Sequence, residues 1–446
     1  MTPSPRGAPS PLARSPTPYG LWSGVGVNVG VMIGVGVFVS AGFMASSLGP
    51  VPILLAWLVG GVLAMAGARA YAEVARLVPR SGGEYRYLST LVHPALGYLA
   101  GWTTVLAGFS APIASNAAIA GPFAQTLIPS MDPRYVSIGL VVLVTAMHAF
   151  DLRLSKRSQD LLAALKVILL AGFIAVGLAL GRAQAPTWTP PQPAPDLLGS
   201  FMANLVYVMY AYTGWNTAVY AAEEFRAPKT IARSMTLAVL AVGAIYLLLN
   251  WVFVANLDAA SVEAFLKGDN AKVTLAHVVA RGLVGSVGAD VMSALVVLVL
   301  FSGMSSMAMI GPRVCAAMAQ DGFLPRRFAA QAGRPPMFSV LFLGALSLTL
   351  VLTYTADALI THVGLILTLM SILTGLALFK ARFERPRRCP PPRASSLIAA
   401  SVFACGCGWM LYAAVAERPS LLVWMAALAA VSSVAYAAHR TWRVHP

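Results

Sequence analysis

Residues 28–38 read Asn-Val-Gly-Val-Met-Ile-Gly-Val-Gly-Val-Phe, and residues 210–216 read Tyr-Ala-Tyr-Thr-Gly-Trp-Asn. Each is an apolar segment interrupted by glycine and small polar residues, and the two lie at corresponding places, five predicted helices apart. Because lipid offers backbone groups no hydrogen-bond partner, a membrane helix opens only where it lines a cavity within the protein. Two such breaks predict a transporter whose site lies near the middle of the bilayer.

The composition indicates a membrane protein. Of the 446 residues, 58% are hydrophobic and only 11% are charged, whereas a soluble chain of this length needs a more polar surface. The net charge of +15 does not indicate nucleic-acid binding, because the basic residues are dispersed over short loops. The cysteines and histidines show no metal-ligand spacing, and no nucleophile–base pair lies at membrane depth. We therefore expect no enzyme activity, catalytic residue, cofactor or metal.

Apolar windows of about twenty residues, the length that crosses the hydrocarbon, predict an all-α integral membrane protein with twelve transmembrane helices. The windows are 19–46, 51–77, 95–127, 136–150, 161–180, 201–222, 235–256, 284–318, 338–354, 359–380, 395–415 and 421–438. Residues 1–18, which are rich in proline, are expected to form a disordered cytoplasmic tail.

The positive charges predict the orientation. With the N-terminus in the cytoplasm, 23 of the 31 lysines and arginines fall in cytoplasmic segments and six on the opposite side, while Arg69 and Lys166 lie within helices. This bias predicts that both termini are cytoplasmic. The first broken helix then runs outward and the sixth runs inward, as an inverted five-plus-five repeat requires. We expect one repeat over residues 19–180, its inverted copy over residues 201–380, and two additional helices over residues 395–438.

The two breaks also predict a kind of ligand. Gly34, Val35 and Gly36 let the first helix unwind, so that the amides of the next half-helix present partial positive charge to a carboxylate. Unwinding near Tyr212 and Gly214 frees carbonyl oxygens that suit an ammonium group. Together the breaks fit the zwitterion of an α-amino acid. For either cluster alone, the alternative is a seam of small residues that allows close helix packing.

Four motifs resemble those of a known family. Residues 33–38 are similar to the unwound-helix motif of the amino acid–polyamine–organocation (APC) superfamily, and residues 210–216 resemble the sixth helix of its L-type amino acid transporter branch. Residues 79–85 (Pro-Arg-Ser-Gly-Gly-Glu-Tyr) resemble the family's loop after helix 2. Arg313, with residues 321–325 (Asp-Gly-Phe-Leu-Pro), resembles the segment after helix 8. The motifs stand in the family's order and span the transport core.

The resemblance implies a fold with helices 1 and 6 broken at the bilayer midplane, and transport of amino acids by alternating access. It also implies that Tyr210 is an aromatic gate over the substrate, for which an ordinary core tyrosine is the alternative. The predicted substrate-binding residues are Ile33, Gly34, Val35, Gly36, Tyr210, Ala211, Tyr212 and Gly214.

Lys166 lies within the predicted fifth helix, and a charge inside the membrane is a functional candidate by default. In sodium-coupled relatives of the fold, a cation lies between helices 1, 5 and 8. A lysine in helix 5 resembles the sodium-independent members, in which its ammonium takes that space. Ser305 and Ser306 on helix 8 are the hydroxyls expected at such a coupling site. The alternative is a lysine that snorkels to the cytoplasmic interface.

Arg69 and Glu73 lie four residues apart near the cytoplasmic end of the second helix. Residues at this spacing face each other on a helix, so they are expected to form an ion pair. The pair is either part of a cytoplasmic gate or an ordinary interfacial contact.

These observations predict a secondary active transporter of amino acids, coupled to protons or working by exchange. Helices 1, 3, 6 and 8 offer no acidic residue to the expected pocket, which favours neutral substrates. Sodium-coupled symport is the mechanistic alternative, and a transport-inactive amino acid sensor is the alternative from another class. The expected partners are an amino acid and the lipid bilayer. The resemblance also implies that heteromeric members of the family are bridged to a heavy chain at the loop between helices 3 and 4. Because this loop contains no cysteine here, no disulfide-linked heavy chain is expected. The excess of arginine over lysine suits a GC-rich bacterial source, and hence an inner (plasma) membrane.

Overall fold

The computed structural model describes residues 19–437, apart from 151, 183–185, 191–195, 259, 261, 264–274, 330–335, 385–390, 418, 420, 421, 424, 425, 428 and 431. The predicted tail over residues 1–18, and part of the predicted last helix over residues 421–438, lie outside the described residues.

The described chain is built from helices. Those of the first half are α1 (Leu21–Met32), α2 (Gly36–Met44), α3 (Pro50–Leu77), α4 (Gly83–Leu91), α5 (Pro94–Thr103), the π-helical turn η2 (Thr104–Ser110), α6 (Ala111–Leu127), α7 (Pro133–Ala149) and α8 (Leu152–Leu180). Those of the second half are α9 (Leu197–Tyr212), the 3₁₀ segment η3 (Thr217–Glu224), α10 (Pro228–Ala255), α12 (Leu275–Ile310), α13 (Pro312–Gln320), η4 (Arg326–Phe328), α14 (Met337–Thr353), α15 (Ala356–Phe383) and α16 (Ala394–Glu417).

Prolines and glycines set several of these boundaries. Pro50, Pro94, Pro133 and Pro228 each begin a helix, where the missing N–H costs no hydrogen bond and the fixed φ suits the first turn. Between α3 and α4 the chain turns at Gly82, whose φ of 119° is a conformation that L side chains rarely adopt.

Within the described residues, seven helical spans are long and apolar enough to cross a membrane: Pro50–Leu77, Pro94–Leu127, Arg157–Leu180, Pro228–Ala255, Leu275–Gln320, Val363–Phe383 and Ala394–Ala416. The pair formed by α1 and α2, bent by 41° at a short break, is an eighth candidate. The helices α7 and α14 are apolar but shorter. The prediction of an all-helical membrane protein is confirmed for the described residues, and the count of twelve transmembrane helices stays a prediction.

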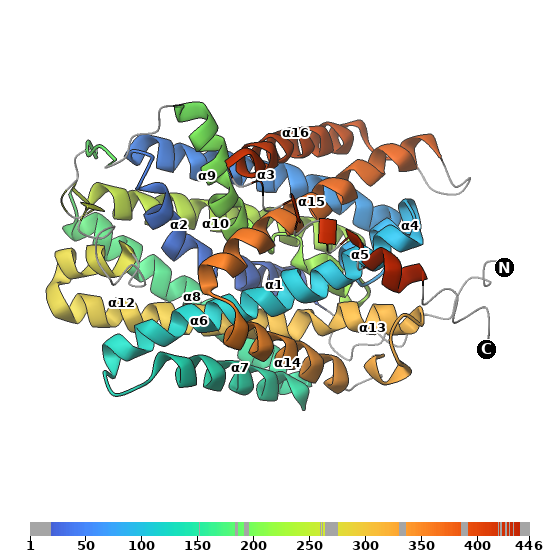
Figure 1. Ribbon diagram of the computed structural model, residues 1–446, viewed down its shortest axis with the longest axis horizontal. Coiled ribbons are helices and arrows are strands. Elements are labelled where there is room, and N and C mark those ends of the chain that lie inside the picture. Colours follow the sequence, from blue (N-terminus) through green and yellow to red (C-terminus); the bar gives the residue numbers. More distant parts are fainter. Residues whose placement is uncertain are drawn as a thin grey trace.

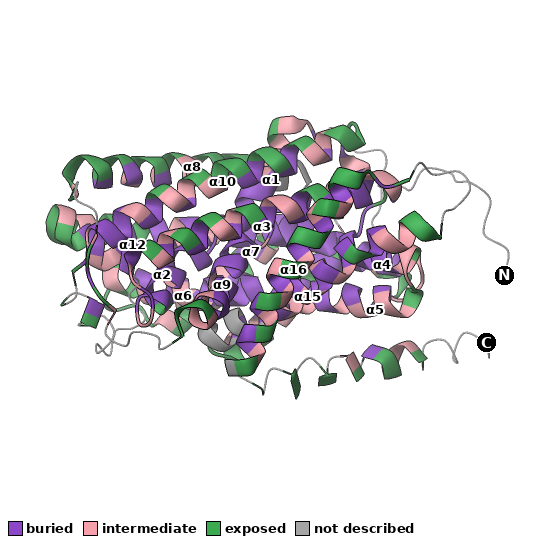
Figure 2. Cartoon of the chain, turned by 90° about the horizontal axis from the view of Figure 1, so that it is seen from above, coloured by how far each residue is buried: buried purple, intermediate pink, exposed green. Residues whose placement is uncertain are grey.

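Most helices run along the long axis of the molecule, with α4 and α13 at the same end (Figure 1). The broken pair α1–α2 lies inside the bundle, where α1 packs against α8, α10 and α12, and α2 packs against α9. Figure 2 shows buried residues along the centre of the bundle and many exposed ones on outlying helices such as α8. Large apolar side chains on that surface, including Leu161 and Ile168 of α8, are exposed. Such a surface fits hydrocarbon rather than water.

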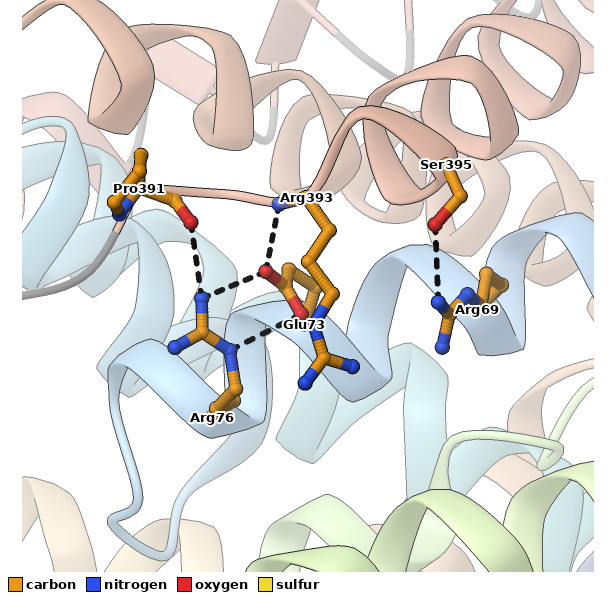
Figure 3. Close-up of polar contacts among 6 residues, drawn as sticks. All are labelled: Arg69, Glu73, Arg76, Pro391, Arg393 and Ser395. Atoms are coloured by element: carbon orange, nitrogen blue, oxygen red, sulfur yellow. Dashed lines mark hydrogen bonds and ion pairs between the residues drawn. The ribbon is translucent and has the colours of Figure 1, made fainter.

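The expected ion pair between Arg69 and Glu73 does not form. Arg69 instead donates to the Ser395 hydroxyl at 3.0 Å, and Glu73 pairs with Arg76 at 2.7 Å and accepts the backbone N–H of Arg393 at 2.9 Å (Figure 3). The prediction considered α3 alone, and the start of α16 supplies competing partners. These contacts fasten α3 to the chain that enters α16.

Candidate functional site

The first break lies between α1 and α2. The helix α1 ends at Met32, and Ile33 takes an extended conformation with φ −80° and ψ 93°. The Lys166 ammonium donates to two carbonyl oxygens freed there, Gly30 at 2.9 Å and Ile33 at 2.7 Å. The backbone N–H of Val35 donates to Asn116 Oδ1 on α6 at 3.1 Å. Side chains from two other helices therefore take over hydrogen bonds that a continuous helix would make itself.

The second break lies between α9 and η3. The helix α9 ends at Tyr212, Thr213 is extended with ψ 137°, and Gly214 has a φ of 106°. That φ favours glycine. The Thr217 hydroxyl donates to the Gly214 carbonyl at 2.6 Å. The N–H of Ala218 donates to Oδ1 of Asn28 on α1 at 2.9 Å, which joins the two broken helices.

The two breaks lie directly against each other. A Cβ on Gly36 would lie 2.6 Å from the Cα of Ala211, and one on Gly214 would lie 2.5 Å from Cγ1 of Val31. Neither position has room for a side chain, so glycine is needed at both for the close approach. The close packing proposed as the alternative for a single cluster therefore occurs at the breaks themselves.

Tyr246 of α10 joins both breaks and was not singled out from the sequence. Its hydroxyl lies 2.6 Å from the Met32 carbonyl oxygen and 2.9 Å from that of Ala211, and its side chain is buried. A tyrosine in an apolar membrane helix was the available signal, because a buried phenol needs a hydrogen-bond partner.

Lys166 does not reach the interface: it is fully buried in α8, against the first break. The predicted hydroxyls lie on α12 nearby but have other partners. Ser306 Oγ accepts from Gln159 Nε2 at 2.5 Å, and Ser305 Oγ lies 2.8 Å from His148 Nε2. A Cβ on Gly30 would lie 2.3 Å from Ser306 Oγ, which places the first broken helix directly on α12.

Tyr210 stands at the end of α9, and its side chain is buried. Its hydroxyl lies 3.1 Å from Ser115 Oγ on α6, and a Cβ on Gly364 of α15 would lie 3.5 Å from the tyrosine Cβ. The tyrosine thus bridges three helices at the second break.

A cavity opens on the η3 side of the second break. Its wall includes residues 213–217 at the second break, Tyr220 from η3, Phe109 from η2, Thr368 and Ser371 from α15, Phe403 from α16, and Glu84 from α4. Of the eight predicted substrate-binding residues, Gly214 lines this cavity, while the others lie at the packed junction of the breaks or in the turns beside it.

Glu84 brings to this wall the carboxyl group that the transmembrane helices do not supply. It is buried, and it accepts hydrogen bonds from Tyr71 at 2.9 Å, from Asn216 at 2.7 Å, and from Tyr220. Burial raises the pKa of this carboxyl above its ordinary value, although the three donors act in the opposite direction. The sequence motif pointed to this loop but not to the side chain's place in the cavity.

A second set of contacts closes the end of the bundle that holds α4 and α13. Arg313 of α13 forms a bidentate pair with Glu224 at the end of η3, with one contact at 2.8 Å. The backbone N–H of Tyr19 donates to the Glu224 carbonyl at 2.8 Å. The residues just before α1, the end of η3 and α13 therefore meet here.

Known proteins with similar sequences point in the same direction. A family model described as amino acid permease matches residues 19–438. The human large neutral amino acids transporter small subunit 2 is 28% identical over 386 residues, which cover 82% of this chain and 70% of that protein. The serine/threonine exchanger SteT of Bacillus subtilis is 28% identical over 315 residues, 69% of each chain. The human Asc-type amino acid transporter 1 is 26% identical over 364 residues, which cover 77% of this chain and 67% of that protein. The chain thus belongs to the amino acid permease family of the APC superfamily, near its L-type amino acid transporter branch.

Proposed function

We propose that this permease is a sodium-independent secondary transporter of neutral amino acids that works by alternating access, with proton coupling or exchange. The observation that carries the proposal is the fully buried Lys166 ammonium, which donates to the Gly30 and Ile33 carbonyls at the first break. Carbonyl oxygens of an unwound helix are ligands that suit a sodium ion. In this protein the Lys166 ammonium is hydrogen-bonded to these carbonyl oxygens instead.

The substrate zwitterion is proposed to bind beside the packed junction of the two breaks, at Ile33, Gly34, Val35, Gly36, Tyr210, Ala211, Tyr212 and Gly214. Gly36 and Val37 stand in the first turn of α2, where backbone N–H groups have no partner within their own helix and favour an anion. The carboxylate of the substrate is assigned to these amides. Its ammonium is assigned to carbonyl oxygens of the second break. Tyr210 is proposed to be the gate, because its hydroxyl bond to Ser115 spans α9 and α6 beside the junction.

The proposed architecture is twelve transmembrane helices, with repeats over residues 19–180 and 201–380 and two further helices over residues 395–438. Each proposed repeat starts with a broken helix: α1–α2 in one and α9–η3 in the other. The charge bias supports cytoplasmic termini in an inner (plasma) membrane. On this orientation, the Arg313–Glu224 pair lies at the cytoplasmic end and contributes to closing it.

Neutral substrates are proposed because the acidic group at the cavity already accepts three hydrogen bonds from the protein. The names of two similar proteins refer to large neutral amino acids and to serine and threonine, which agrees with this assignment. The missing cysteine in residues 128–132, between α6 and α7, supports a transporter without a disulfide-linked heavy chain.

The proposal is tested by uptake of a panel of labelled amino acids into proteoliposomes, with and without a pH gradient and with and without sodium. We expect saturable, sodium-independent uptake of neutral amino acids, lost in Lys166→Ala. Uptake that follows the pH gradient indicates proton coupling, and uptake that needs internal amino acid indicates exchange. Sodium-dependent uptake would contradict the role of Lys166. Binding without flux would favour the sensor.

A further inference from the structure

Residues 81–84 hold η3, the segment that follows the second break. The N–H of Gly82 donates to the Tyr220 carbonyl at 3.2 Å, and the N–H of Glu223 donates to Ser81 Oγ at 3.0 Å. The Glu84 carboxyl accepts from Tyr220 and Asn216. We call these four hydrogen bonds, made by Ser81, Gly82 and Glu84, the clasp.

Of the three residues that make the clasp, Glu84 is the one that also borders the cavity. Its Oε1 accepts from Tyr71 on α3 at 2.9 Å and from Asn216 in the broken segment at 2.7 Å, while Oε2 accepts from Tyr220 on η3. Glu84 is 4% exposed as a residue, and its carboxyl group therefore fastens η3 to α3 and α4. If η3 moves during transport, these bonds must break.

No described cation pairs with this carboxyl. Arg86, two residues along α4, is bound to Asp321 at 2.5 Å instead. The titratable groups that face Glu84 are the phenols of Tyr71 from α3, Tyr220 from η3 and Tyr87 from its own helix. A buried carboxylate without a cation is costly, so the buried arrangement favours the protonated acid. The raised pKa of Glu84 has the same cause.

We propose that Glu84 is a proton-binding site that keeps the clasp closed while its proton is bound, with Oε2–H donating to the Tyr220 hydroxyl and Oε1 accepting from Tyr71 and Asn216. When the carboxyl O–H bond breaks, the proton passes to water in the cavity and the electron pair stays on the carboxylate. Water stabilises the resulting anion better than the buried site does, so deprotonation favours an arrangement in which η3 has left α4 and the cavity is hydrated. The inference rests on the proposed function in taking η3 to move during transport.

The test measures how readily water reaches the cavity. Thr368→Cys places a thiol on the cavity wall at a residue whose hydroxyl bonds to its own helix. The rate of labelling by a small, water-soluble thiol reagent is measured against pH in Thr368→Cys, with the unsubstituted protein giving the background from native cysteines. The same measurement in Thr368→Cys with Glu84→Gln cancels the thiol's own pH dependence. Thr368→Cys with Glu223→Gln is the matched control, because it removes a neighbouring carboxyl outside the cavity wall.

The labelling rate of Thr368→Cys, divided by that of the double variant with Glu84→Gln, is expected to be near one at acidic pH. This ratio should rise by up to about tenfold per pH unit once Glu84 ionises. The labelling rate of Thr368→Cys with Glu223→Gln, divided by the same denominator, should rise in the same way. Tyr220→Phe removes a contact that the proposal gives only to the closed, protonated arrangement, so the rise should move to lower pH. The labelling rate of Thr368→Cys with Tyr220→Phe, divided by that of Thr368→Cys alone, tests this even if the Glu84→Gln protein folds poorly. A ratio that stays flat overturns the proposal. So does a Glu84→Gln protein that binds no amino acid at any pH, because that result assigns the carboxylate to the substrate ammonium.

Counterflow of a labelled neutral amino acid, at equal pH on both sides, separates this inference from the proposed function. A rising ratio in a protein that carries out no counterflow would leave the Glu84 site standing and remove the transport proposal. Counterflow together with a flat ratio would leave the transport proposal standing and overturn the Glu84 site.

Discussion

The ammonium of Lys166 lies 2.7 Å from the carbonyl oxygen of Ile33, deep in the protein and at the point where the first membrane helix opens. A buried charge is costly unless hydrogen bonds satisfy it, and an opened helix is costly unless its carbonyls find donors. Each feature therefore supplies the partner that the other requires. This mutual dependence explains why a lysine stands in the middle of an apolar helix.

Replacing Lys166 by alanine leaves the Gly30 and Ile33 carbonyls without their donor. Hydrogen bonds to a charged group contribute about 1.5–3 kcal/mol each, so we expect uptake to fall at least tenfold, since that range corresponds to about one to two orders of magnitude. Thermal unfolding of the purified protein should show a lower midpoint as well. Lys229→Ala, at the start of α10, is the control and should behave as the parent protein. Full uptake in Lys166→Ala would show that the ammonium plays no part in transport.

The close contact between Gly36 and Ala211 predicts that even a methyl group is too large there. A Cβ on Gly36 would lie 2.6 Å from a backbone atom, which cannot move away as a flexible side chain can. Overpacking of this kind costs about 1–3 kcal/mol, so Gly36→Ala should lose most uptake and some stability. Gly26→Ala on α1, where nothing lies within 4 Å of the added Cβ, should keep both. Equal uptake by the two variants would show that the two breaks can move apart at Gly36 and Ala211 without loss of transport.

Tyr246→Phe removes a single oxygen atom from the junction of the breaks. The carbonyls of Met32 and Ala211 then lose a shared partner, and an unsatisfied buried group costs about 1–3 kcal/mol. We expect weaker binding of the amino acid and slower uptake, measured as Kd and as initial rate. Tyr412→Phe, at an exposed position, tests whether losing a phenol elsewhere has any effect. Unchanged Kd and rate in Tyr246→Phe would leave the hydroxyl with a structural role at most.

Tyr210 is expected to act through its ring more than through its hydroxyl. Tyr210→Phe loses the contact with Ser115 but keeps the aromatic wall, so uptake should fall only a few-fold, and Ser115→Ala should show the same fall. Tyr210→Ala opens the site and should raise KM well beyond either. Identical kinetics for the alanine and phenylalanine variants would argue against a gate.

The raised pKa of Glu84 predicts the direction in which the stability of the folded protein changes with pH. Because burial raises this pKa above its ordinary value of 4.5, the folded protein holds the proton more tightly than the unfolded chain does. The corresponding stabilisation is complete below the ordinary pKa and is lost as pH rises through the raised one. As pH rises, the thermal unfolding midpoint of the parent protein should therefore fall relative to that of Glu84→Gln. The Glu223→Gln variant should follow the parent, and parallel curves for all three proteins would contradict the shift.

Local sequence patterns identified the apolar helices as a class, the glycines at the breaks and the lysine within an apolar helix, because each of these is a property of one segment. The partners of those residues are properties of the folded bundle. Arg69 was assigned to Glu73 by helical spacing, but Ser395, which is distant along the chain, takes that contact. The cavity position of Glu84 and the place of Tyr246 over both breaks also depend on helices that are distant in sequence. Such contacts form only when the helices pack, so no single segment predicts them.

The most direct test of the account is the binding of one neutral amino acid, compared with its methyl ester and its N-acetyl derivative, to the purified protein. If the amides of the first break hold the carboxylate and the carbonyls of the second hold the ammonium, both derivatives should bind at least tenfold more weakly, since each loses a charge-assisted interaction of about 1.5–3 kcal/mol. Equal binding of either derivative would contradict the claim that the two breaks together recognise the zwitterion.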